Sequence, residues 1–176
     1  MKARLAAVAL AVLLAIPSSA QRRNDPMTPF EIDQLRDAAQ DADIRLKLYV
    51  TFARARLDAL DKARAEAKAA DRGEVTHDRL QDFLDVYDEL DDNINTFADR
   101  KADMRKVLKV ILDADNEFQA KLRALKQAAA ASPEEIKQYD FLLSNALDTL
   151  DSAVQDHRQL LSEQEEAFKH KKPTKS

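Results

Sequence analysis

The chain of 176 residues contains no cysteine, no tryptophan and a single glycine. Without cysteine it has no disulfide, no thiolate ligand for zinc or an iron–sulfur cluster, and no thiol nucleophile. One glycine is too few for the tight hairpin turns of an all-β protein. Charged residues make up 34% of the chain, which is typical of long helices with one face in water. The composition therefore predicts an all-α protein.

Residues 1–20 have the pattern of a secretory signal peptide. Lys2 and Arg4 precede an apolar run, and Ser18 and Ala20 are small residues at the positions that a signal peptidase reads. The apolar run is too short to span a bilayer comfortably. We expect cleavage after Ala20, a periplasmic or secreted location, and no stable membrane insertion of the mature chain.

The formal net charge is −4, and it becomes more negative when residues 1–20 are removed, because they carry two cations and no acid. Nonspecific nucleic-acid binding depends on a basic surface that displaces counterions from phosphates. The charge therefore argues against a nucleic-acid partner.

Three long helices are predicted, over residues of about 28–70, 76–130 and 133–169. Thr28, Pro29 and Glu31 form the pattern of a capping box with proline at the first helical position. Gly73 suits the left-handed residue that ends a helix, and it marks the first turn. We expect a disordered linker over residues 21–27 and a basic disordered tail over residues 170–176.

The second helix carries an uninterrupted heptad pattern, which is typical of coiled-coil-like packing. Its a and d positions are Leu80, Phe83, Tyr87, Leu90, Ile94, Phe97, Lys101, Met104, Leu108, Ile111, Asp115, Phe118, Leu122, Leu125 and Ala129. Short turns make neighbouring helices antiparallel. The sequence thus predicts an elongated antiparallel three-helix bundle with a long central helix. A break near Asp99–Asp103 or Asp113–Asn116, which would give four helices, stays open as the alternative.

Three polar residues fall on the predicted core positions. Lys101 and Asp115 are expected to fix the register of the helices, with Lys101 meeting an acid such as Glu163 and Asp115 meeting Arg36. His157 lies on the inner stripe of the third helix. His77 and His170 are far from it along the helices, so we interpret His157 as a hydrogen-bonded core histidine and not as a metal ligand.

The sequence offers no recognisable site for catalysis, a cofactor or a metal. The acidic residues between Asp85 and Asp92 lie on a predicted helix, whereas a calcium loop places its carboxylates on a flexible loop with a central glycine. A thin bundle provides no cleft for paired carboxylates. We therefore predict that the protein is not an enzyme and needs no cofactor.

The segment Thr28-Pro29-Phe30-Glu31 loosely resembles the Leu-Thr-x-x-Gln helix start of exported stress chaperones of the Spy and CpxP type. Met27 stands in place of the leucine and Glu31 in place of the glutamine. The likeness covers a few residues that any capped helix shows, so it does not assign the chain to that family.

The leading functional hypothesis is an exported, noncatalytic helical protein that binds other proteins, as a periplasmic chaperone or adaptor does, or that associates with itself. A helical rod presents faces on which a partner helix packs. The alternatives are a structural spacer of the envelope and, less favoured, a metal or small-ligand carrier. The basic tail is expected to make at most weak contact with anionic envelope polymers.

Overall fold

The computed structural model describes residues 26–170, and every regular element in that range is an α-helix. Its helices are α1 (Pro29–Asp37), α2 (Ala42–Glu66), α3 (Arg72–Asp99), α4 (Arg105–Ala129), α5 (Pro133–Ile136) and α6 (Asp140–His170). The predicted signal peptide and most of the predicted linker and tail lie outside the described residues, so those predictions stay predictions. The all-α prediction is confirmed for the part described.

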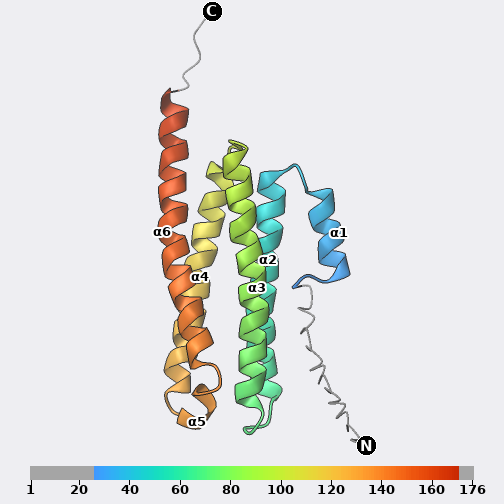
Figure 1. The fold of residues 1–176 in the computed structure, drawn as a ribbon, viewed down its shortest axis with the longest axis vertical. Coiled ribbons are helices and arrows are strands. Elements are labelled where there is room, and N and C mark those ends of the chain that lie inside the picture. Colours follow the sequence, from blue (N-terminus) through green and yellow to red (C-terminus); the bar gives the residue numbers. More distant parts are fainter. Residues whose placement is uncertain (1–25, 171–176) are drawn as a thin grey trace, which may run out of the picture.

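Four of the helices form an elongated bundle (Figure 1). Helix α2 packs closely on α3, and α4 packs closely on α6, each pair being antiparallel. Two parallel pairs, α2 with α4 and α3 with α6, join these hairpins with fewer contacts. Helices α3 and α4 thus occupy one diagonal of the bundle, although they are consecutive in the chain.

The predicted three-helix bundle with a long central helix must be corrected. The central segment is two helices, because α3 ends at Asp99 and α4 begins at Arg105. This break lies at the first of the two places that the sequence left open. The apolar stripe was nevertheless read correctly, because Phe97 and Met104 on either side of the break are both buried.

The connection between α3 and α4, residues 100–104, reverses the chain without glycine or proline. Lys101 adopts a left-handed conformation with φ of 58°, and the N–H of Ala102 donates to the carbonyl of Phe97, as in a Schellman motif. The side chain of Gln164 on α6 then holds the connection from outside. It accepts from the Met104 N–H at 2.9 Å and donates to the Ala102 carbonyl at 3.0 Å.

The first predicted helix is also divided. Asp41 caps α2 by accepting from the Ile44 N–H at 2.9 Å, so α1 folds back along the outside of α2. The capping box of Thr28 and Glu31 is present, and Glu31 has a second role, because its carboxylate pairs with Arg56 of α2 at 2.7 Å.

Gly73 is not the left-handed residue that the sequence suggested, because no described glycine has positive φ. It lies in the first turn of α3. A Cβ there would meet the side-chain amide of Gln138 at 2.6 Å. The residue therefore permits a close approach of the segment between α5 and α6, and it does not end a helix.

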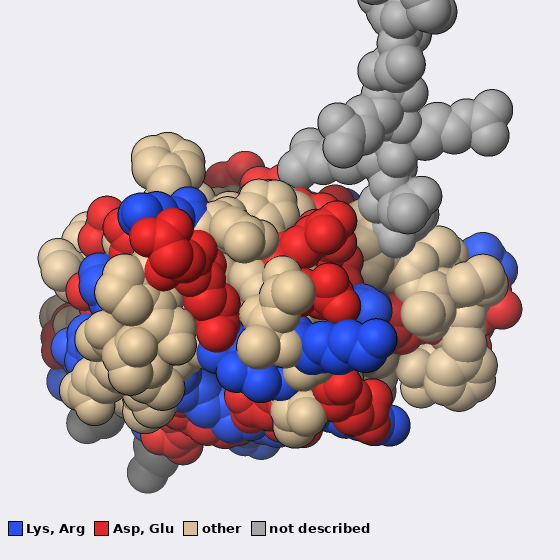
Figure 2. All heavy atoms as spheres, turned by 90° about the horizontal axis from the view of Figure 1, so that it is seen from below, with Lys and Arg blue, Asp and Glu red and all other residues tan. Residues whose placement is uncertain are grey.

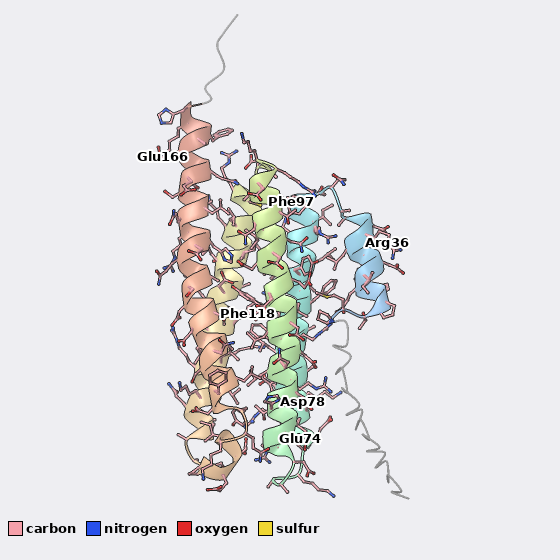
Figure 3. The ribbon with its side chains drawn as sticks, viewed as in Figure 1. Arg36, Glu74, Asp78, Phe97, Phe118 and Glu166 are labelled. Atoms are coloured by element: carbon pink, nitrogen blue, oxygen red, sulfur yellow. The ribbon has the colours of Figure 1, made fainter. Side chains whose placement is uncertain are left out.

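The apolar core runs the length of the bundle and contains an aromatic cluster on the diagonal. The ring centroids of Phe83 and Phe118 are 5.5 Å apart, in an edge-to-face arrangement, and Tyr87 packs on both rings. Figure 3 shows Phe118 inside the bundle about halfway along it and Phe97 near the end where α3 turns into α4.

The conformation of Lys101 yields a test of the α3–α4 connection. A left-handed backbone is unfavourable for a residue with a Cβ, so Lys101→Gly is expected to raise the free energy of unfolding by about 0.5–1 kcal/mol. In the control Lys62→Gly, the same replacement within α2 lowers it by up to about 1 kcal/mol. Urea unfolding of both variants measures the difference, and destabilisation by Lys101→Gly would contradict the assigned conformation.

Candidate functional site

Three polar side chains meet in the middle of the core. Asp115 of α4 is fully buried, and it accepts hydrogen bonds from the Tyr87 hydroxyl at 2.7 Å and from Nδ1 of His157 at 2.8 Å. Tyr87 lies on α3 and His157 on α6. A single carboxylate therefore joins three of the four bundle helices.

The other ring nitrogen of His157 faces α3. Its Nε2 lies 3.5 Å from Asp91 Oδ1, which is longer than a normal hydrogen bond. This atom is buried and has no hydrogen-bond partner among the described residues. Asp91 is about half exposed, so it connects the buried cluster with the surface.

The electrostatics of this cluster favour a charged imidazole. Burial alone lowers the pKa of His157, but the hydrogen bond to Asp115 and the charges of Asp115 and Asp91 outweigh it and raise the pKa to about 9. Burial and the neighbouring charge of Asp115 also raise the pKa of the Tyr87 hydroxyl, which stays a hydrogen-bond donor. The imidazolium and the carboxylates thus form a structural ion pair.

This arrangement is poorly suited to acid–base catalysis. A general base must be neutral and within reach of a substrate proton, whereas His157 is charged near neutral pH and 2% exposed. No serine or threonine is bonded to the imidazole within the described residues. The cluster organises the core and holds Asp91 at its edge.

The three polar core residues behave differently from one another. The prediction of a hydrogen-bonded core histidine at position 157 is confirmed. The predicted pairing of Asp115 with Arg36 is wrong, because Arg36 lies on the exposed face of α1 and pairs with Asp33 (Figure 3). Lys101 is exposed in the α3–α4 connection, so it is not a core register residue.

An open groove of about 600 Å³ lies beside this cluster, between α3 and α6. We call it the acidic groove. Its carboxylates are Asp88, Asp91, Asp92, Asp148 and Asp156. No lysine or arginine is among its lining residues. Sequence reasoning found the aspartates of α3 but not those of α6, because only the fold brings the two sets together.

A second groove, of about 510 Å³, lies at the end of the bundle where α3 turns into α4. We call it the end groove; its walls include Ala98, Lys101, Ala102, Arg105, Leu160 and Phe168. Helix α6 extends beyond its neighbours here, and Glu166 marks the overhanging part in Figure 3. The ring of Phe168 is 59% exposed and stacks against the Arg105 guanidinium at 3.5 Å.

The opposite end of the bundle has a different character. Figure 2, which views the molecule along its length from that end, shows acidic and basic side chains interspersed with uncharged ones. A surface with mixed charges of this kind does not favour a partner that is strongly acidic or strongly basic. The two grooves are therefore the more distinctive surfaces.

Comparison with protein-family models, curated sequences and solved structures found no match. Among residues 26–170, no group of three or more potential metal-binding side chains is clustered. None of the helices described there is both long enough and apolar enough to cross a membrane.

The buried ion pair predicts how stability depends on pH. Because the folded-state pKa of His157 lies above its usual 6.5, its contribution is complete below pH 6.5 and is lost as the pH rises through 9. We expect the free energy of unfolding to fall over this interval by an amount on the order of 2 kcal/mol.

Chemical denaturation between pH 6.5 and 9 measures this change. The control His157→Gln is expected to be less stable at pH 6.5, because Asp115 loses a charged partner in the core. Its stability should vary little with pH over the same interval. A wild-type protein with the same stability at both pH values would contradict the charged state of the histidine.

Proposed function

We propose that the protein is an exported, noncatalytic binding protein that holds exposed segments of other proteins, as a periplasmic chaperone or adaptor does. The observation that carries this proposal is the end groove with the exposed ring of Phe168. The signal-peptide pattern of residues 1–20 supports export. The buried, charged imidazole of His157, which is bonded to Asp115, offers no free catalytic base.

The chemistry of the end groove defines the kind of segment it accepts. Small side chains, Ala98 and Ala102, leave room for an apolar side chain, and Leu160 and Phe168 supply apolar walls. Charges of both signs border it, from Lys101 and Arg105 to Asp103 and Glu163. An amphipathic segment matches such a groove, with apolar anchors in the pocket and polar groups at the rim.

The test uses the mature chain, residues 21–176, mixed at an equimolar ratio with an unfolded outer-membrane protein. We expect it to suppress aggregation, measured by light scattering. Phe168→Asp should raise the concentration needed by about tenfold, because it removes an apolar anchor and places a charge there. Circular dichroism checks that the variant keeps its helicity.

Phe141→Asp is the matched control. Phe141 is 87% exposed and lies at the other end of α6, so the same replacement leaves the end groove intact. It is expected to retain wild-type suppression. If the wild-type chain fails to suppress aggregation, the chaperone proposal is wrong and the structural spacer becomes the better hypothesis; equal loss in both variants would remove the end groove as the binding surface.

A further inference from the structure

A third pocket, of about 310 Å³, lies where the connection between α1 and α2 meets the end of α3. Figure 1 shows this connection at the end of the bundle where α3 turns into α4. We call it the arginine pocket, and its walls include Gln40, Arg45, Asn93, Thr96, Phe97 and Arg100. Its two charged lining residues are both arginines, and no carboxylate of the described residues lines it.

Arg45 differs from the other partly buried arginines of residues 26–170. Each of the others pairs with a carboxylate: Arg54 with Glu117, Arg56 with Glu31, Arg64 and Arg72 with Glu135, and Arg105 with Asp103. Arg45 forms no ion pair with a described residue and donates only to neutral acceptors. These are the Leu35 carbonyl, Asn93 Oδ1 at 2.7 Å and the Tyr49 hydroxyl at 3.3 Å.

A positive charge withdrawn from water is costly unless an anion compensates it. The pocket therefore contains a partly buried guanidinium that lacks a counter-ion. This observation, and not the mere presence of basic side chains, indicates that an anion completes the pocket.

Arg100 supplies a second charge on the opposite wall, in the connection between α3 and α4. Its guanidinium lies over the Phe97 ring, 5.8 Å from the centroid, and it forms no ion pair within the described part of the chain. A guanidinium carries five N–H donors, so the three bonds of Arg45 leave some of its donors free. Gln40 adds a side-chain amide. The pocket thus offers two positive charges and several N–H donors.

Thr96 distinguishes between possible anions. Its hydroxyl donates to the Asp92 carbonyl at 2.9 Å, so its oxygen is left to accept a hydrogen bond. At neutral pH inorganic phosphate keeps a P–O–H group that can donate to this oxygen. Sulfate and ionised carboxylates carry no such proton, so they leave Thr96 without a donor.

We propose that the arginine pocket binds inorganic phosphate, with Arg45 and Arg100 as its charged partners and Gln40 as a further donor. Thr96 accepts from the protonated oxygen of the ion. Guanidinium groups suit phosphate because their planar N–H donors match pairs of its oxygens. A volume of about 310 Å³ is at the small end of the range for ligand sites. The proposal goes beyond the chaperone function and uses a different surface.

Isothermal titration of the mature chain with inorganic phosphate, at neutral pH and low salt, tests the proposal. We expect saturable binding that weakens by about tenfold or more in Arg100→Gln, because one charged contact is lost. Arg100 is exposed, so its replacement leaves the fold intact. Arg45 is kept, because its bonds to Leu35 and Asn93 also join α1, α2 and α3.

The matched control is Arg158→Gln. Arg158 is also exposed and has no ion pair within residues 26–170, but it lies on α6 outside the pocket. This variant should change the affinity by less than about twofold, since a distant surface charge is screened.

The role of Thr96 has a separate test. Wild-type protein should bind sulfate at least about tenfold more weakly than phosphate, and Thr96→Val should reduce this preference, because valine has the same shape and no acceptor. Phosphate should also raise the melting temperature of the wild-type chain more than sulfate does at equal ionic strength. Both ions strengthen burial nonspecifically, so the excess reports the bound ion. Arg100→Gln should lose this excess.

Absence of saturable phosphate binding, equal weakening in the two arginine variants, or equal affinity for sulfate would each overturn the proposal. Tighter binding of glycerol 3-phosphate than of inorganic phosphate would replace the free ion with a phosphate ester. None of these measurements uses an unfolded protein or a residue of the end groove. Failure here is therefore distinct from failure of the chaperone proposal.

Discussion

The ion pair between Asp115 and His157 is the interaction on which the arrangement of the bundle depends. A carboxylate removed from water is costly unless it is paired and hydrogen-bonded, and Asp115 obtains both partners from other helices. Any shift of α6 along α4, or of α3 across the core, would leave a buried charge without its partner. The pair thus selects one register among those that the apolar stripes alone would allow.

The pair also bears on where the two grooves lie. Because His157 and Asp115 are paired with each other inside the core, the two grooves lie outside this pair, on the surface of the bundle. Parallel contact between α3 and α6 is less extensive than the contact within each antiparallel pair, and that looser side holds the acidic groove. The overhang of α6 produces the end groove. The acidic groove thus follows from the limited contact between α3 and α6, and the end groove follows from the greater length of α6.

The heptad pattern predicted which residues are buried but not where the chain turns. The a and d positions from Leu80 to Ile94 and from Met104 to Leu122 are buried in the core, as predicted. Burial follows the local spacing of apolar residues, which the sequence shows directly. The sequence offered a turn near Asp99–Asp103 only as the alternative, because the distance from Phe97 to Met104 is one full heptad and no glycine or proline marks the turn. Its backbone is held by Gln164, which is distant in sequence. The acidic groove could not be predicted from the sequence for the same reason. Asp91 and Asp156 share this groove only because α3 and α6 lie side by side in the fold.

The diagonal placement of α3 and α4 has a consequence for how the protein folds. Most contacts join α2 to α3 and α4 to α6, so each half of the chain contains its own antiparallel hairpin. Contacts between segments close in sequence form quickly because little loop-closure entropy is lost. The contacts within each hairpin can therefore form before the contacts between the two hairpins. Since Tyr87 belongs to the first half and Asp115 and His157 to the second, the buried hydrogen-bond network is completed only when the halves meet.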